Sequence, residues 1–337
     1  MRLATYNVEW FNALFDDAGR VLADDNWSGH HDVRRGEQAE ALAAVFRAMD
    51  ADAVMVIEAP DQNGRRDTVR ALENFAGWAG LRTGRAVMGY KNDTEQEIAL
   101  LYDPAALSVR HDPQLSPQAP RFDQSFKIDL DIDATPDIVS FSKPPLELHC
   151  SSAAGTVFRI IGVHVKSKAP HGAKSAEEAV RISIANRRKQ LAQCIWLRRR
   201  VETHLAAGDA LIVLGDFNDG PGLDEYEKLF GRSGVEIVMG LDGGGEGQRL
   251  YDPHARRAVS QRIAAAPTTA RFFIPAENRW LAALLDYVMV SPGLMQRDPR
   301  WRIWHPFDDP VCYHDRALRR ALLHASDHFP VTLDIDL

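Results

Sequence analysis

Apolar residues near the start of the chain are arranged in a strand, helix, strand order. Residues 3–8 mix aliphatic, aromatic and β-branched side chains and predict a first strand. Residues 34–49 carry apolar side chains at helical spacing, among them Leu42 and Phe46. Residues 52–58 form a short, mostly apolar run, which predicts a strand buried on both faces. This order predicts layered sheets covered by helices.

The rest of the chain places further strands around one long helix. Residues 176–205 predict that helix, and Ser175 followed by Glu178 fits a capping box at its start. Gly208 is expected to end the helix, and the apolar residues 210–214 then predict another strand. Further strands are expected at residues 97–102, 156–165, 284–290 and 329–335.

Length and charge narrow the possible classes of protein. With 337 residues and 45% hydrophobic content the chain can bury a large core, and we expect one domain over residues 1–337. The net charge of -7 gives no global positive field. This weighs against tight duplex binding, although a metal-centred site can supply its own positive charge in a nuclease.

The cysteines and the chain start indicate a reduced, soluble setting. Cys150, Cys194 and Cys312 lie far apart and include no Cys-x-x-Cys pair, so we expect neither a disulfide framework nor structural zinc. Each is interpreted as a small buried hydrophobe. No apolar signal segment opens the chain, and no stretch approaches ~18 uninterrupted apolar residues. We expect a cytoplasmic protein with no transmembrane segment.

Polar side chains stand at the ends of two predicted strands. Asn7 and Glu9 are two residues apart, as are Asp216 and Asn218, so each pair projects from one face of an extended chain. A carboxylate beside a carboxamide offers one metal-binding oxygen and one neutral group that can orient water or phosphate. Two simpler interpretations stay open: an exposed strand end for the first pair and an Asx-type turn for the second.

Glu58 ends a run of mostly apolar residues. A carboxylate at the end of a buried strand needs a partner, and a divalent metal ion would provide one. A salt bridge to Arg65 or Arg66 is the alternative, but it leaves the other strand-end acids unexplained.

Two histidines accompany these acids. Alternation along one predicted strand puts His164 and Lys166 on the same face, although a lone strand histidine is more often structural than catalytic. Lys166 opens a basic loop that suits contact with a substrate phosphate. Asp327 and His328 precede the last strand. Asp286, on the strand before it, is the natural carboxylate to fix the tautomer of His328.

Six short motifs, taken in order, resemble the motif series of the endonuclease/exonuclease/phosphatase superfamily, the deoxyribonuclease-like metal-dependent phosphoesterases. They are Tyr6-Asn7-Val8-Glu9-Trp10, Val56-Ile57-Glu58, Gly162-Val163-His164, Gly215-Asp216-Phe217-Asn218, Leu285-Asp286-Tyr287 and Ser326-Asp327-His328. Their joint occurrence in order is far more specific than any one of them. The resemblance implies an α/β (α+β) fold, a four-layer αββα sandwich of two mainly antiparallel sheets flanked by helices.

The resemblance also implies a metal centre. Glu58 would be the principal ligand of the ion, with Asn7, Glu9 and Asp327 near the ion or ordering its waters. Oxygen-rich ligands without a thiolate pair favour Mg²⁺ over zinc, and Mn²⁺ is an alternative.

Catalytic roles follow from the same resemblance. Asp216 and Asn218 would position the attacking water and the phosphate. His328, oriented by Asp286, would stabilise charge on the phosphoryl oxygens or take up a proton. At the remaining position some members use tyrosine and others histidine, so His164 is similar to the second group and would act as an acid or a phosphate contact.

These expectations describe hydrolysis of a phosphodiester by in-line attack of water, without a covalent intermediate. We expect a phosphoester substrate, with nucleic acid as the first candidate, and no protein partner. A small-molecule phosphatase or phosphodiesterase, acting on a nucleotide, an inositol phosphate or a lipid headgroup, is the alternative that the acidic net charge favours. A catalytically inactive binding module on the same fold is less favoured, because every expected polar position holds a chemically competent residue.

Overall fold

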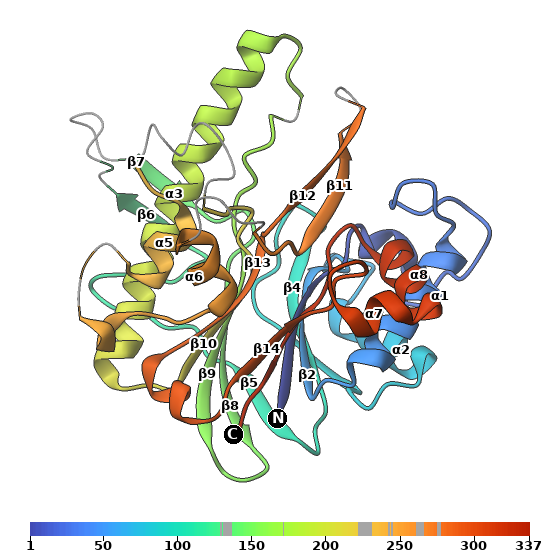
Figure 1. The fold of residues 1–337 in the computed structure, drawn as a ribbon, viewed down its shortest axis with the longest axis horizontal. Helices are drawn as coiled ribbons and strands as arrows, with labels where there is room; N and C mark the ends of the chain where they lie inside the picture. Colours follow the sequence, from blue (N-terminus) through green and yellow to red (C-terminus); the bar gives the residue numbers. More distant parts are fainter. Residues whose placement is uncertain are drawn as a thin grey trace.

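The computed structural model describes every residue except 129, 131–136, 171, 222–230, 242, 244, 261–265 and 275–277. Two large β-sheets lie face to face, with helices on both outer sides (Figure 1). The six-stranded sheet contains, in order, β14 (Arg300–Ile303), β15 (Val331–Asp334), β1 (Arg2–Asn7), β2 (Ala53–Ala59), β4 (Glu97–Tyr102) and β3 (Arg85–Met88). The five-stranded sheet contains β13 (Asp286–Val290), β10 (Leu211–Asp216), β9 (Val157–His164), β8 (Leu146–Ser152) and β5 (Leu107–His111).

Both sheets are mainly antiparallel, as expected. In each sheet one neighbouring pair is parallel: β1 with β2, and β9 with β10. The other described pairs of these sheets run antiparallel. Two separate hairpins are formed by β6 (Ser125–Ile128) with β7 (Asp137–Ser140), and by β11 (Ala270–Ile274) with β12 (Arg279–Ala283).

Helices cover the outer face of each sheet. On the six-stranded sheet these are α1 (Arg35–Met49), α2 (Thr68–Ala79), α7 (Pro310–His314) and α8 (Arg316–Ala325). On the five-stranded sheet they are α3 (Ala176–Ala207), α5 (Gly234–Met239) and α6 (Pro253–Ser260). Short 3-10 helices lie at η1 (Phe11–Leu14), η2 (Glu246–Gln248) and η4 (Pro292–Gln296). The predicted four-layer αββα sandwich is therefore confirmed.

Three hydrophobic clusters hold these layers together. The middle cluster fills the space between the sheets, with Met55 and Leu100 from one sheet facing Leu148 and Ile160 from the other. The two outer clusters join each sheet to its own helices. Because successive strand residues point to opposite faces, both sides of the central strands are apolar. The three cysteines are free and buried, as expected.

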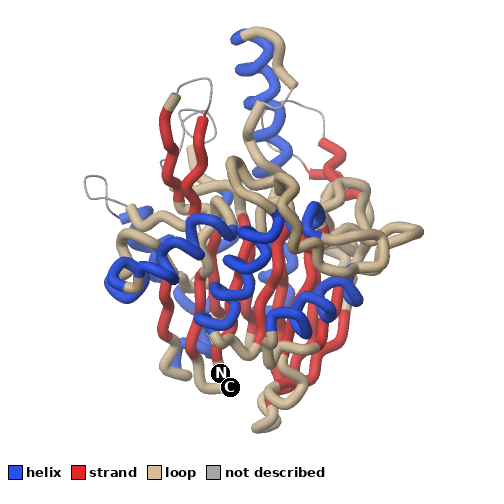
Figure 2. The backbone as a smooth tube through the Cα atoms, turned by 90° about the vertical axis from the view of Figure 1, so that its right-hand side faces the viewer, coloured by secondary structure: helices blue, strands red, loops and turns tan. Residues whose placement is uncertain are grey.

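The long helix α3 begins and ends close to the predicted boundaries. The Ser175 side chain accepts a hydrogen bond from the backbone N–H of Glu178 at 3.1 Å. The Glu178 carboxylate accepts from the backbone N–H of Lys174, one residue before the one that a capping box requires. Gly208 ends the helix in a left-handed conformation with φ 76°, which glycine adopts without strain. The N-terminal part of α3 projects beyond the sheets (Figure 2).

Close packing between the sheets gives a first prediction. A methyl group at Gly162 on β9 would meet the Met55 side chain of the opposite sheet, closest at Sδ and with Cε at 2.7 Å. Gly162→Ala is therefore expected to lower the free energy of unfolding by about 1–3 kcal/mol in urea denaturation. In a Met55→Ala background the same change should cost less, because the truncated side chain leaves room. An equal cost in both backgrounds would show that this contact is not the cause.

No helix within the described residues has an apolar stretch long enough to cross a bilayer. Both chain termini lie at the end of the sandwich opposite the projecting part of α3 and the β11–β12 hairpin (Figures 1 and 2).

Candidate active site

The strand-end acids and histidines meet at one end of the sandwich. Asn7 ends β1, His164 ends β9 and Asp216 ends β10. Asp286 begins β13, which runs antiparallel to β10 and pairs with it at Asp216. His328 lies just before β15, which is antiparallel to β1. The topology therefore brings residues that are far apart in sequence to one edge of the two sheets.

Alternation along the strands aims these side chains into the space between the sheets. On β10, Ile212 and Leu214 belong to the middle hydrophobic cluster, and Asp216 is the next residue on that face. On β9, Ile160 lies in the same cluster and His164 follows on its face. The polar groups continue the inner apolar faces at the point where the two sheets end.

These residues line a cleft of about 790 Å³. Nine of the ten residues singled out from the sequence contribute to its wall: Asn7, Glu9, Glu58, His164, Lys166, Asp216, Asn218, Asp327 and His328. The tenth, Asp286, lies behind His328 and bonds to it. The structure therefore places all ten in or directly behind one cavity, which is what the sequence hypothesis required.

Asp216 is held by three donated hydrogen bonds. Asn7 Nδ2 and Asn218 Nδ2 both donate to Asp216 Oδ2 at 3.0 Å, and the backbone N–H of Asn218 donates to Oδ1 at 2.7 Å. A carboxylate has about four acceptor positions, so one remains for a water molecule or a substrate proton. Burial raises the pKa of Asp216 to about 7, so this carboxylate can take up a proton near neutral pH.

His328 is oriented by a buried carboxylate, as expected. Its Nδ1 lies 2.7 Å from Asp286 Oδ2. Burial lowers the pKa of His328, but the neighbouring Asp286 outweighs this effect and raises the pKa well above the ordinary histidine value. The bond leaves Nε2, the other ring nitrogen, for the cleft. The imidazolium form is therefore favoured at this position.

Sequence reasoning missed Thr269, which fixes Asp286 in turn. The Thr269 hydroxyl donates to Asp286 Oδ2 at 2.8 Å and accepts from the backbone N–H groups of Leu285 and Asp286 at 3.0 and 2.9 Å. Thr269 is fully buried. It lies just before β11 and far from any recognised motif, so no local signal marked it.

Removing the Thr269 hydroxyl should therefore weaken the hold on His328. Thr269→Val is expected to lower kcat by about tenfold, as for other residues that orient a catalytic histidine. It should also lower the free energy of unfolding by about 1–3 kcal/mol, because two buried N–H groups lose their acceptor. Thr269→Ser keeps the hydroxyl and should restore kcat. Steady-state kinetics and urea denaturation measure both effects, and an unchanged kcat in the valine variant would contradict this positioning role.

Glu58 occupies a strained position at a bulge. Its φ is 63°, in the left-handed region, and the pairing of β2 with β4 shifts register between Ile57 and Ala59. The bulge turns the Glu58 side chain into the cleft, where Oε2 accepts from the backbone N–H of Trp10 at 3.3 Å. Burial raises the pKa of Glu58.

The alternative salt bridge for Glu58 does not form. Arg65 pairs with Asp17 at 3.7 Å, and Arg66 donates to the carbonyl of Phe15 at 2.8 Å. Glu58 is therefore free of both arginines that sequence reasoning kept open.

Two more carboxylates lie at the acidic side of the cleft. Glu9 is in contact with Nδ1 of His30, a residue that sequence reasoning did not single out. Burial opposes protonation of His30, but the bond to Glu9 raises its pKa. Burial also raises the pKa of Asp327 to about 7, and Asp327 Oδ1 lies 3.9 Å from His328 Nε2.

The chemistry of this side of the cleft fits a hard divalent ion. Asn7 Nδ2 is committed to Asp216, and its Oδ1 is buried with no hydrogen-bond donor among the described residues. An orphaned carboxamide oxygen beside a buried carboxylate is an oxygen donor set of the kind that Mg²⁺ uses. Within the described part of the chain, no three His, Cys, Asp or Glu side chains are placed to share one ion. Mg²⁺ commonly binds through one or two carboxylates and keeps several waters, so Glu58 and Asn7 are the candidate ligands that the described residues offer.

The basic side of the cleft contains a second residue that sequence reasoning missed. Lys143 Nζ lies 3.2 Å from His164 Nε2, and Nδ1 of His164 has no partner among the described residues. Burial lowers the pKa of His164 well below its ordinary value, and the positive charge of Lys143 adds to this effect. His164 is therefore neutral. Lys143 lies in a loop before β8, where a lone lysine gives no sequence signal.

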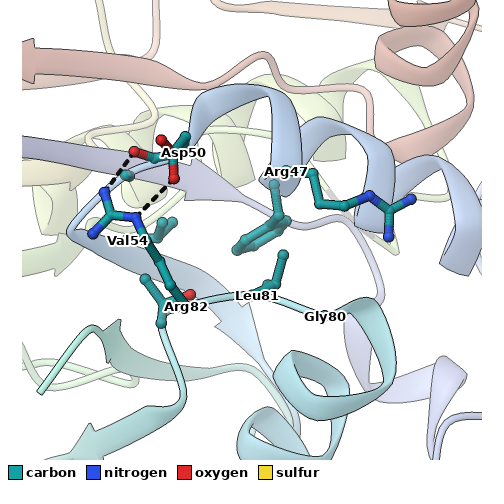
Figure 3. A pocket seen from close by; sticks show the side chains of 9 residues that line it. Arg47, Asp50, Val54, Gly80, Leu81 and Arg82 are labelled. Atoms are coloured by element: carbon teal, nitrogen blue, oxygen red, sulfur yellow. Dashed lines mark hydrogen bonds and ion pairs between the residues drawn. The ribbon is translucent and has the colours of Figure 1, made fainter.

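A second, smaller pocket does not offer comparable chemistry. Its volume is about 270 Å³, and it lies at the opposite end of β2, among Arg47, Asp50 and Arg82 (Figure 3). Arg82 is engaged by the carboxylates of Asp50, Asp52 and Asp103 at 2.6–3.0 Å. The charged groups of this pocket are therefore satisfied within the protein.

Comparisons with known proteins agree with the motif series. A family model described as Endonuclease/Exonuclease/phosphatase family matches residues 4–328. No curated protein sequence matches the chain significantly. The solved 3′ phosphatase NExo from Neisseria, bound to a product DNA hairpin, is similar with a TM-score of 0.50 at 18% identity, covering 100% of both chains. Truncated TDP2 from Caenorhabditis elegans gives a TM-score of 0.51 at 14% identity, covering 100% of this chain and 97% of that one. At sequence identities this low, the structural similarity shows a common fold and no more.

Proposed function

Because the chain belongs to the endonuclease/exonuclease/phosphatase family, we propose that it is a divalent-metal-dependent phosphodiesterase of the nuclease or nuclease-like type. The observation that carries this proposal is the convergence of Glu58, Asp216 and the His328–Asp286 pair in one cleft. The reaction is hydrolysis of a phosphodiester bond by in-line attack of water, with no covalent intermediate.

Glu58 and the free oxygen of Asn7 would hold the ion, Mg²⁺ or Mn²⁺, with Glu9 and Asp327 ordering its waters. When bound, the ion would supply positive charge to the phosphate oxygens. The raised pKa values of Glu58 and Asp327 support a cation here, because buried carboxylates that repel one another gain from a positive partner. The other proposed roles in the reaction belong to side chains of the protein.

Asp216 is the proposed acceptor of the proton from the attacking water. Its three hydrogen bonds from Asn7 and Asn218 fix the carboxylate plane and leave one acceptor position. The Asn218 side chain also donates to the carbonyl of Val165 at 3.1 Å, which ties this loop to the end of β9. Because these hydrogen bonds already fix the Asp216 side chain, aligning it with the attacking water costs little conformational entropy.

His328 is the proposed stabiliser of negative charge on the phosphoryl oxygens. The favoured imidazolium form can donate a hydrogen bond from Nε2, whereas a proton acceptor would need the neutral ring. The proton-acceptor role that sequence reasoning kept open is therefore assigned to Asp216 instead. Fixed donors in a buried site stabilise developing charge strongly.

His164 is proposed as a phosphate-orienting contact and not as an acid. Its lowered pKa means that the ring has no proton to spare at neutral pH. Lys143, 3.2 Å away, supplies the nearby positive charge.

Two assays test this function. With bis-p-nitrophenyl phosphate, a diester, and p-nitrophenyl phosphate, a monoester, the protein should hydrolyse the diester faster when Mg²⁺ or Mn²⁺ is present. Plasmid, single-stranded DNA and RNA should then be compared at one salt concentration, because electrostatic binding depends on it. Preference for the monoester would favour the alternative, a small-molecule phosphatase, which the net charge of -7 supports. Absence of hydrolysis in all assays would reject both enzymes and favour the binding module.

A further inference from the structure

The basic side chains of lysine and arginine are unevenly represented among the described residues that line the cleft. The chain contains 40 lysines and arginines, of which eight are lysines. Three of these eight, Lys143, Lys166 and Lys189, line the cleft, whereas no arginine is found among its described lining residues. A lysine ammonium is a compact point charge with three rotatable donors, which suits a phosphate whose oxygens it contacts in more than one orientation.

The three lysines are close enough in the cleft for their charges to interact. The charge of Lys143 interacts favourably with those of Glu58 and Asp216 and unfavourably with that of Lys166. Lys166 in turn interacts with Lys189 on helix α3. Lys143 is therefore coupled in charge to the catalytic acids, and Lys166 and Lys189 are coupled to one another within the same cleft.

Lys166 and Lys189 are two cations on one wall of the cleft. No carboxylate within the described ranges forms an ion pair with either of them, and their charges repel one another. Burial lowers the pKa of Lys166, and the charge of Lys189 adds to this effect. Two like charges on the wall of a cavity are unfavourable unless an anion joins them. A dianionic phosphate would match them in charge.

The protein holds these two lysines in a fixed relation to the catalytic loop. Gln193 Oε1 accepts from the backbone N–H of Lys166 at 2.9 Å, and Gln190 Nε2 donates to the Lys166 carbonyl at 3.0 Å. Both glutamines are buried and belong to α3, and Gln190 directly follows Lys189. Gln190 Nε2 also donates to the carbonyl of Asn218 at 2.8 Å. One turn of α3 therefore carries Lys189 and forms hydrogen bonds with the backbone of Lys166. The same turn also bonds to the Asp216–Asn218 loop.

We propose that Lys166 and Lys189 form a subsite for a second phosphate of the substrate, adjacent to the scissile one. This inference rests on the proposed function, because it takes the scissile phosphate to lie among Asp216, His164 and His328. The substrate class is then a phosphodiester that carries a neighbouring phosphate group, as in a nucleotide strand or a phosphorylated nucleotide ester. Esters with a single phosphate leave the subsite empty and bind less tightly.

Equilibrium binding tests the subsite without hydrolysis. Calorimetry in Mg²⁺ buffer should show that thymidine 3′,5′-bisphosphate binds the wild-type protein at least about tenfold more tightly than thymidine 5′-phosphate. In the double variant Lys166→Met/Lys189→Met this ratio should fall to below about threefold, and Lys189→Met alone should give an intermediate value. Lys127→Met, which removes an exposed lysine on β6 outside the cleft, should keep the wild-type ratio. A ratio near one in the wild-type protein, or an unchanged ratio in the double variant, would overturn the subsite.

Hydrolysis separates failure of the subsite from failure of the proposed function. The substrates are the p-nitrophenyl ester of thymidine 5′-phosphate and the same ester with an added 3′-phosphate. The ratio of their kcat/KM values should favour the second ester in the wild-type protein, and the double variant should lose this preference. If both esters are hydrolysed at equal efficiency, the result supports the phosphodiesterase activity and rejects the second-phosphate subsite. If neither ester is hydrolysed but the bisphosphate still binds at least about tenfold more tightly than the monophosphate, the result supports the subsite and rejects the phosphodiesterase activity.

Discussion

Replacing His328 with alanine is expected to lower kcat for bis-p-nitrophenyl phosphate by about 10²–10³-fold, the range for removing one fixed donor to a developing negative charge. The variant lacks the Nε2 donor at the point where negative charge develops on the phosphate. It also leaves Asp286 without the imidazole that lies 2.7 Å from its Oδ2. KM should change much less than kcat, because the interaction strengthens in the transition state. Steady-state kinetics at saturating Mg²⁺ measure the effect.

Two controls keep this result interpretable. His314→Ala removes an exposed histidine of α7 and should leave kcat unchanged. His328→Gln retains a side-chain amide that can donate to Asp286, so it should fold even where the alanine variant is unstable, and it should still lack the cationic donor. Near wild-type kcat in the folded glutamine variant would reject the role of His328.

Replacing Glu58 with glutamine is expected to produce the other large effect. The amide keeps the shape of the side chain, and its oxygen can still accept from the backbone N–H of Trp10, but it removes the carboxylate that would bind the ion. The apparent affinity for Mg²⁺ should fall by at least about 10²-fold, which exceeds the loss on changing outer-shell partners. Measuring the initial rate against Mg²⁺ concentration gives this affinity, and calorimetry with Mn²⁺ gives it without turnover.

The matched control for this change is Glu73→Gln, on helix α2 and outside the cleft. Its Mg²⁺ dependence should equal that of the wild-type protein. If Glu58→Gln binds Mn²⁺ as tightly as the wild-type protein does, Glu58 is not the principal ligand. A loss of activity with unchanged metal binding would give Glu58 a different role in the reaction.

The layers of this fold could be predicted because they depend on local patterns. Residues 97–102 form a strand with the predicted bounds, and the helix predicted over 34–49 begins one residue later. The strand-end acids could be found for the same reason, since a polar residue such as Asp216 directly after an apolar run breaks the strand pattern. The order of six motifs then specified the family.

Contacts between distant segments could not be predicted in this way. Lys143 and Thr269 each act on a histidine more than twenty residues away, and neither stands in a motif or a periodic element. Their importance follows from which loops and strand ends the tertiary fold brings together at this end of the two sheets, and the spacing of residues along the chain does not encode that. The bulge at Glu58 is likewise a property of its pairing with β4.

The structure also favours one of the two roles that the sequence left open for His164, a phosphate contact, over the other, an acid. His164 and Lys166 both line the cleft, but only the buried surroundings show that His164 is neutral. The roles of the individual site residues, the cytoplasmic location and the single domain over residues 1–337 stay predictions.

The dependence of diester hydrolysis on a divalent ion tests the central claim most directly. The rate with bis-p-nitrophenyl phosphate should be measured with Mg²⁺, after EDTA, and after Mg²⁺ is restored, for the wild-type protein and for His328→Gln. The expected result is hydrolysis that disappears with EDTA and returns with Mg²⁺ in the wild-type protein, and that stays at least about 10²-fold lower in the variant. Hydrolysis that persists in EDTA, or that is equal in both proteins, would contradict a metal-assisted reaction centred on this cleft.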